Sequence, residues 1–127
     1  MTAMLEHARR HPREEVCGLL GGRDGTAVRY YPATNIAAHP AREYLMDPRQ
    51  QIDAMRRMRE GGEALLGIFH SHPDSAAEPS DTDLARAAYP DTIYLIAGPV
   101  GERMELRAYH FDGTGFAPAA IQITHNR

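Results

Sequence analysis

The chain has 127 residues, of which 43% are hydrophobic, and this length and composition predict one α/β domain spanning residues 1–127. All 14 basic residues are arginine, so the absence of lysine excludes a Walker-type phosphate loop, Schiff-base catalysis and a serine–lysine dyad. A formal net charge of -3 without a run of basic residues argues against nucleic-acid binding.

The cysteine content and the apolar runs indicate the compartment. Cys17 is the only cysteine and cannot form an internal disulfide. No opening stretch joins a basic region to an apolar run of signal-peptide length. Apolar runs such as 93–98 are far shorter than the roughly 20 residues that cross a bilayer. We therefore expect a cytoplasmic protein without a membrane segment.

The first elements in chain order are a helix and a strand hairpin. Residues 2–11 place apolar side chains on one helical face, and Pro12 ends the run. Two apolar segments, 16–22 and 27–34, flank a turn-like RDG sequence and predict paired strands.

A second helix and a buried strand follow. Asp47 is the expected N-cap of a helix that begins at Pro48 and that Gly61 and Gly62 end. The continuous apolar run at 64–72 predicts a strand buried on both faces.

The last part of the chain predicts one more helix and three strands. Residues 80–89 form the expected helix, closed by Pro90, and 92–98 a further buried strand. Alternation at 105–111, a DGTG turn and a return at 119–124 predict a final hairpin. These elements together predict a mixed α/β body.

Two histidines stand at the end of the predicted strand 64–72. Residues i and i+2 of a strand share a face, so His70 and His72 present their imidazoles together. A histidine in such a run is commonly a hydrogen-bonded core or surface residue, but the pair can bind one metal ion. Five further histidines lack such a neighbour: His7, His11, His39, His110 and His125.

The next predicted helix offers a third ligand. Asp83 follows His72 after a proline-containing loop that can turn the chain back over the strand end. Ser80 and Asp83 also form a capping-box pattern, which explains both residues without a metal. The two roles are compatible. Two histidines and one carboxylate leave a fourth position for water, the usual arrangement of catalytic zinc.

Glu15 is the candidate for proton transfer. It precedes the predicted strand 16–22, where its carboxylate can act as general base on a metal-activated water and then as acid to a leaving amine. Spacing alone does not show this contact, and Glu14 and Glu15 also fit a solvated surface.

These residues together resemble the JAMM (MPN-type) zinc metallopeptidases. The signature of that family is a glutamate, then H-[ST]-H-P, then S-x-x-D at a fixed spacing. It is matched here by Glu15, by 70–73 and by 80–83. The stretches HPREEVCGLLGG, ATNIAAHPAREYLMDP, GIFHSHP and PSDTDL are also similar to small bacterial members, so the resemblance covers most of the chain.

The resemblance implies a fold and a role for each site residue. The fold would be the family's α/β sandwich, a curved mixed β-sheet flanked by helices and similar to cytidine deaminases, with the chain beginning in the family's first helix. His70, His72 and Asp83 are implied as zinc ligands and Glu15 as the general base. Ser80 would donate to the oxyanion of the tetrahedral intermediate.

The resemblance also bears on the substrate. Family members that cleave ubiquitin chains hold them with long insertions, which are absent between these motif segments, so linkage-specific deubiquitination is not expected. Small bacterial relatives are associated with ubiquitin-like sulfur carriers of the ThiS, MoaD or CysO type. We therefore expect a zinc metallopeptidase or isopeptidase that trims the Gly-Gly tail of a carrier bound along an exposed sheet edge. The sequence leaves a homodimer open.

Three alternatives remain at this stage. Cys17 is explained as a small buried hydrophobic residue, but its closeness to Glu15 would also let it occupy the open metal position and silence the enzyme. A catalytically silent MPN-type scaffold would show lost ligands, whereas all are present here. A structural zinc site would need a fourth protein ligand, for which Cys17 is the only candidate.

Overall fold

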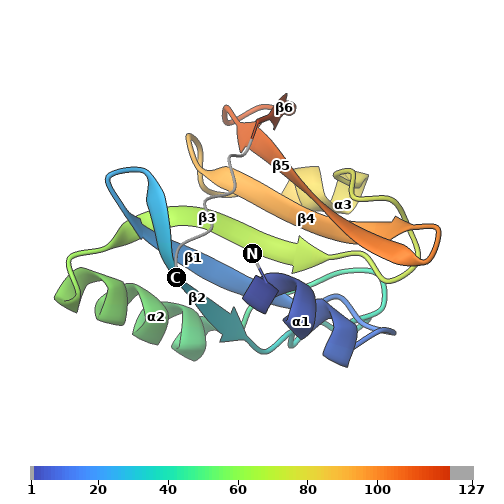
Figure 1. Ribbon diagram of the computed structural model, residues 1–127, viewed down its shortest axis with the longest axis horizontal. Helices are drawn as coiled ribbons and strands as arrows, with labels where there is room; N and C mark the ends of the chain where they lie inside the picture. The colour runs from blue at the N-terminus through green and yellow to red at the C-terminus, as the bar shows by residue number, and fades with distance from the viewer. Residues whose placement is uncertain (1, 121–127) are drawn as a thin grey trace.

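A computed structural model describes residues 2–120. Six strands form one mixed sheet in the order β2-β1-β3-β4-β5-β6, and helices lie on both of its faces (Figure 1). The predicted mixed α/β fold is confirmed. The elements are α1 Thr2–Arg10, β1 Cys17–Arg23, β2 Thr26–Ala33, α2 Pro48–Glu60, β3 Ala64–Ser71, α3 Asp81–Arg86, β4 Ile93–Val100, β5 Arg103–Phe111 and β6 Phe116–Ala119.

The pairing of β3 determines where the sheet opens. β3 is antiparallel to β1 and parallel to β4. A parallel pair needs a crossover connection, which the loop after His72 and helix α3 provide. The carboxyl ends of β3 and β4 therefore meet at one edge, the usual place for a functional site in an α/β sheet.

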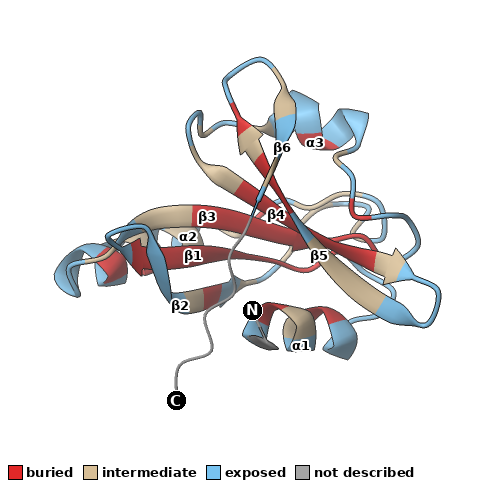
Figure 2. Cartoon of the chain, turned by 45° about the horizontal axis from the view of Figure 1, so that its top comes forward, coloured by how far each residue is buried: buried red, intermediate tan, exposed pale blue. Residues whose placement is uncertain are grey.

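Alternate residues of the central strands pack on opposite faces of the sheet. One set forms a buried cluster with α2: Leu19, Ile68 and Tyr94, with Ala54 and Met58 of the helix. The next residue of each strand packs with α1: Leu20, Phe69 and Leu95, with Met4 and Ala8 of the helix. Because both faces are covered, the carboxyl half of β3 is buried throughout (Figure 2), which explains its unbroken apolar run.

The second helix begins and ends as the sequence predicts. The Asp47 side chain accepts a hydrogen bond of 2.9 Å from the Arg49 N–H, and Pro48 is the first helical residue. At the other end the Gly61 N–H donates to carbonyls of the last turn, and Gly62 has a φ of 72°. Within the described range, none of the helices has the length and hydropathy to cross a membrane.

The predicted end of the third helix is wrong. Ser80 is its N-cap, as expected, but α3 stops at Arg86, and Ala87 has extended backbone angles. The Tyr94 hydroxyl accepts hydrogen bonds from the Ala88 and Tyr89 N–H groups at 3.2 and 3.1 Å. This tertiary contact takes the place of helical hydrogen bonds.

The final hairpin is present, but its return strand starts earlier than predicted. β6 begins at Phe116, paired with Phe111, whereas the sequence placed the return at 119–124. The Asp112 carboxylate accepts bonds from the Thr114 and Gly115 N–H groups and closes the turn tightly, so pairing resumes at once. Residues 121–124 lie outside the described range.

Candidate metal centre

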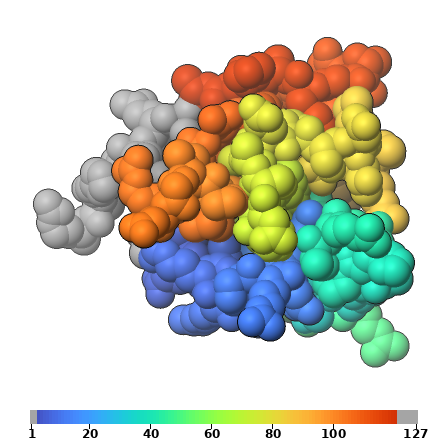
Figure 3. Space-filling view, turned by 90° about the vertical axis from the view of Figure 1, so that its right-hand side faces the viewer, coloured from blue at the N-terminus to red at the C-terminus, as the bar shows by residue number. Residues whose placement is uncertain are grey.

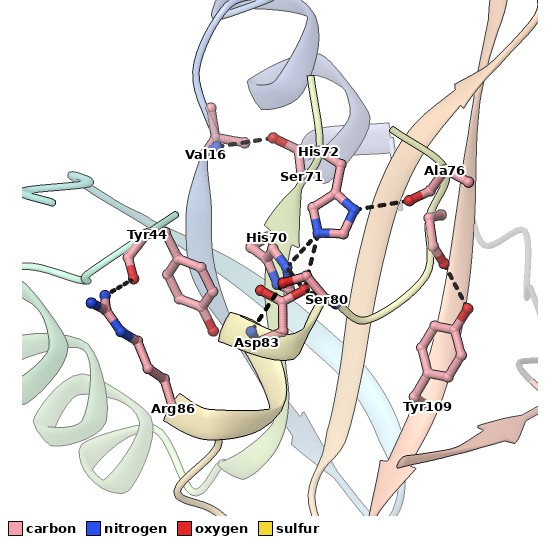
Figure 4. A network of polar contacts seen from close by, with 11 residues as sticks. Val16, Tyr44, His70, Ser71, His72, Ala76, Ser80, Asp83, Arg86 and Tyr109 are labelled. Carbon is pink, nitrogen blue, oxygen red and sulfur yellow. Dashed lines mark hydrogen bonds and ion pairs between the residues drawn. The ribbon is translucent and has the colours of Figure 1, made fainter. Parts of the chain in front are cut away.

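The end of β3 places two imidazoles side by side. His70 and His72 project from the same side of the strand, as the i, i+2 spacing predicts (Figure 4). Their Nε2 atoms are 3.2 Å apart, and the two residues are only 1% and 3% exposed.

Helix α3 brings a carboxylate to the same point. Asp83 Oδ2 lies 3.0 Å from His72 Nε2 and 3.1 Å from His70 Nε2 (Figure 4). The capping box is also present, because the Asp83 N–H donates to Ser80 Oγ at 3.0 Å and the Ser80 N–H donates to Asp83 Oδ2 at 2.9 Å. Asp83 thus completes the capping box of α3 and faces both imidazoles.

The register of β1 against β3 places Glu15 beside this cluster. Cys17 is paired with His70, and the strands are joined just beyond by hydrogen bonds of Val16 to the backbone and hydroxyl of Ser71. A Glu15 carboxylate oxygen, together with ligand atoms of His70, His72 and Asp83, forms a group in which all lie within 4.8 Å of one another. Glu15 is buried, and its Oε1 has no hydrogen-bond partner among the described residues.

The donor pattern of this cluster calls for a positive charge at its centre. His72 Nδ1 lies 2.8 Å from the Ala76 carbonyl, which can only accept, so Nδ1 carries the proton and Nε2 of the neutral ring is a bare lone pair. That lone pair faces the Asp83 carboxylate and His70 Nε2, so a proton on an imidazole or a metal ion must lie between these atoms. Ligands at about 2.0–2.1 Å from a tetrahedral ion lie roughly 3.3 Å apart, close to the spacing here. The residues therefore fit a metal ion.

Burial and the neighbouring groups shift the pKa values of the cluster. Burial raises the pKa of Glu15 to about 7; His72 opposes this shift, and the Asp83 carboxylate adds to it. Burial disfavours charge on Asp83, but hydrogen bonds from His70 and His72 outweigh it and lower the pKa of that carboxyl well below its usual range. Burial lowers the pKa of His70. The Asp83 carboxyl is thus charged at neutral pH, whereas the Glu15 carboxyl titrates near pH 7.

The loop between β2 and α2 covers the site with an aromatic ring, which sequence reasoning missed. Tyr44 stacks on His70 with ring centroids 4.5 Å apart and planes at 24°. The neighbouring Glu43 forms a 2.9 Å ion pair with Arg86 of α3. This pair joins the loop to the helix that carries Asp83, and the two segments lie side by side on the face shown in Figure 3.

Asn35 organises this loop and was also missed. Its side-chain amide donates to the carbonyls of Glu15 and Glu43 at 2.9 and 3.0 Å. Its Oδ1 accepts from the Ala37 and Leu45 N–H groups, both at 3.0 Å. The only sequence signal was the similarity of this whole stretch to the JAMM family, which did not single out Asn35 or Tyr44.

Close packing against β4 holds the loop that orients His72. The Ala76 carbonyl faces His72, and the Tyr109 hydroxyl donates to the Ala77 carbonyl at 2.6 Å. The loop crosses β4 directly over Gly98, where a Cβ atom would stand 2.6 Å from backbone atoms of Ser75 and Ala77. The absence of a side chain at Gly98 therefore allows the loop to pack directly against β4.

Cys17 is the cross-strand neighbour of His70, but its sulfur is not part of the ligand cluster. Its Sγ lies 3.8 Å from the Ala33 carbonyl, and the residue packs in the apolar cluster beneath α2. Burial raises the pKa of the thiol to about 12, with Glu15 adding to the shift. Cys17 is not among the described residues that gather at the centre, so the geometry supports the buried hydrophobic interpretation.

Comparison with known proteins identifies the family. The model of the Prok-JAB family, described as prokaryotic homologs of the JAB domain, matches residues 1–111. The chain belongs to this family. Its members include the JAMM-type proteins that the sequence motif resembles, so the predicted family is confirmed.

Relatives of known name and structure agree with this assignment. The chain is 33% identical to a desampylase of Haloferax volcanii, covering 95% of this chain and 89% of the relative. It is 38% identical to the CysO-cysteine peptidase of Mycobacterium tuberculosis, covering 86% and 76%. A solution structure of a Desulfitobacterium hafniense protein matches with a TM-score of 0.87 and 37% identity over 99% of this chain and 89% of that one. The prediction of a hydrolase is confirmed.

Replacing Gly98 by alanine should weaken metal binding. The added Cβ would force the loop away from β4, and the Ala76 carbonyl would no longer orient His72. Loss of such an orienting contact typically costs 10–100-fold in metal affinity, which competition with a chelator would measure. Gly115→Ala is the matched control, because nothing lies within 4 Å of its added Cβ. Equal affinity of the two variants would contradict this role of Gly98.

Replacing Glu15 by glutamine should stabilise the metal-free protein at high pH. Because the folded pKa of about 7 exceeds the ordinary 4.5, the stability that protonated Glu15 contributes is present below pH 4.5 and lost as pH rises through 7. At pH 8 the glutamine variant should exceed wild type by on the order of 2 kcal/mol, and at pH 4.5 the two should be equal. Urea unfolding with chelator at both pH values would test this. Glu14→Gln, at an exposed position, controls for the removed charge.

Proposed function

We propose that this protein is a zinc-dependent peptidase or isopeptidase that cleaves at the C-terminal tail of a ubiquitin-like sulfur carrier of the ThiS, MoaD or CysO type. The observation that supports it most is the buried group of Glu15, His70, His72 and Asp83. Relatives named for cleaving such proteins, among them the CysO-cysteine peptidase, support the substrate class. A cytoplasmic location and one domain over residues 1–127 complete the proposal.

The proposed ligands are His70, His72 and Asp83, whose atoms meet at 3.0–3.2 Å. Zinc, when bound, acts as a Lewis acid and lowers the pKa of water, so that a nucleophile is available at neutral pH. The Asp83 carboxylate supplies negative charge, and the two imidazoles bind through Nε2. The Ala76 carbonyl fixes the His72 tautomer that presents this nitrogen.

Glu15 is the proposed proton carrier. A pKa of about 7 suits a group that takes a proton from the attacking water and then gives it to the leaving amine. The free Oε1 leaves an acceptor for that proton. A positive ion nearby would lower this pKa, which favours the basic form before attack.

Ser80 is the proposed donor to the developing oxyanion. Its Oγ accepts from the Asp83 N–H, so its own O–H hydrogen remains free to donate. The residue is exposed at the rim of the centre, where a substrate carbonyl can approach. One such donor contributes about 10²-fold to the chemical step.

Near the centre, the end of strand β4 has no partner on its β3 side, and the carrier tail could bind there. β4 continues to Val100, whereas its pairing with β3 ends at Ala97. A flexible Gly-Gly tail can reach a buried centre that side chains would block. We propose this end of β4 as the exposed edge that holds the tail through its carbonyl groups, because Pro99 has no N–H to donate.

The alternatives from the sequence receive less support. A silent scaffold does not explain why the general-base candidate and the three ligand candidates are all buried together. A structural zinc with Cys17 as fourth ligand is disfavoured, because the sulfur packs against Ala33 in an apolar cluster.

Cleavage of a carrier protein is the direct test. A ThiS-type carrier extended beyond its Gly-Gly tail should be cut after the second glycine by zinc-loaded protein and left intact after chelation, as intact-mass measurement would show. Glu15→Gln should keep zinc but lose about 10²–10⁴-fold in turnover, whereas His72→Ala should lose the metal itself. Undiminished cleavage by the glutamine variant would rule out the base assignment, and an uncut carrier would rule out the substrate class.

Replacing Ser80 separates its two roles. Ser80→Ala should lower kcat by about 10²-fold and also cost about 1 kcal/mol of stability through the lost helix cap. Ser80→Gly removes the same hydroxyl but costs only a few tenths of a kcal/mol as a cap. If the hydroxyl stabilises the oxyanion, both variants lose the same rate despite different unfolding free energies. If kcat falls in the alanine variant but not in the more stable glycine variant, Ser80 acts only as a helix cap.

A further inference from the structure

A concave feature lies between helix α2 and strand β2, the strand at one edge of the sheet (Figure 1). This groove has a volume of about 520 Å³ and is lined by 29–32 of β2 and by one side of α2. Within residues 2–120, β2 pairs only with β1, so one side of its backbone has no partner strand. Such an edge is a template for a further strand.

Three arginines border the groove without a carboxylate partner in residues 2–120, and one of them, Arg57, lies over the Tyr31 ring at 5.5 Å from its centroid. Arg29 comes from β2, and Arg49 and Arg57 come from α2. None of the three forms an ion pair with a carboxylate of residues 2–120, and the one acidic residue of the lining, Asp53, is paired with Arg56. In a chain with a formal net charge of -3, this is a local concentration of positive charge that attracts an acidic ligand.

We propose that this groove binds an extended acidic segment of a partner protein, which joins the sheet as a further strand beside β2. Its backbone would pair with β2, and its carboxylates would meet the arginines of α2. Pro32 has no N–H, so the new ladder ends before it and uses 26–31.

The helix sets the spacing of the acidic residues in the partner. Arg49 and Arg57 are eight residues apart on α2, about 12 Å at 1.5 Å per residue. A strand rises about 3.3 Å per residue, so two carboxylates four residues apart, and hence on the same face, span the same distance. The segment thus carries acidic side chains at i and i+4.

Charge argues against a second copy of β2 in the groove, and backbone chemistry argues against a nucleic acid. A two-fold pairing of β2 with β2 of a second copy would place like arginines against each other. A nucleic-acid strand could meet the arginines but has no peptide groups to extend a β-ladder. The proposal uses no residue of the metal centre, so it stands or falls separately from the proposed reaction.

The test uses the full chain and a fluorescent eight-residue peptide of alternating valine and threonine with glutamate at its second and sixth positions. Fluorescence anisotropy should show binding that weakens as salt rises. A peptide with glutamine at both positions should bind at least about tenfold more weakly. NMR should show shift changes and slowed amide exchange along 26–31.

A matched pair of double variants assigns the effect to the groove. Arg49→Gln with Arg57→Gln should lower the affinity for the glutamate peptide about tenfold. Arg9→Gln with Arg59→Gln removes the same charge from exposed positions outside the groove and should change it less than about twofold. Thermal unfolding checks that both variants fold.

Several outcomes would overturn the proposal. Equal affinity of the glutamate and glutamine peptides would remove the acidic requirement. Equal loss in the two double variants would show only a general charge effect, and shift changes elsewhere would place the peptide on another surface. Self-association through β2 that the peptide does not displace, or tighter binding of a single-stranded oligonucleotide, would identify a different occupant.

Discussion

The constraint on which this structure depends is that its buried acceptor atoms need a shared cation between them, either a proton or a metal ion. The Nε2 atoms of His70 and His72 and the Oδ2 atom of Asp83 meet within 3.2 Å in a buried position. Groups of this kind are costly to bury together unless a positive charge lies between them. These groups stay together because the strand and the helix that carry them are held in place by strand pairing and by the helix cap.

Each part of the centre is fixed by a contact that also stabilises the fold. His70 is fixed by the β1–β3 pairing, which Val16 and Ser71 extend past the strand ends. Asp83 is fixed by the cap of its own helix. Such supporting contacts orient metal ligands before any ion arrives, which lowers the entropy lost on binding. Asp83 also links formation of helix α3 to binding at the centre, because the same carboxylate caps the helix and faces the imidazoles.

Local patterns predicted which elements form, and together with the family motif they predicted which residues gather at the centre. The i, i+2 histidines and the capping box depend on short-range geometry, and the family motif carried Glu15 to the same site. The contributions of Tyr44, Asn35 and Gly98 were not predictable, because each depends on segments that only the tertiary fold brings together. The same is true of the early end of α3, which the Tyr94 hydroxyl determines from a later strand.

The ring stacked on His70 gives the molecule a spectroscopic property. The chain contains no tryptophan, so emission from its six tyrosines is not masked by an indole. Tyr44 lies against a proposed ligand, and burial raises the pKa of its hydroxyl. Because the phenol stacks on the imidazole, we expect its emission to change with charge on that ring and so to report on the state of the centre.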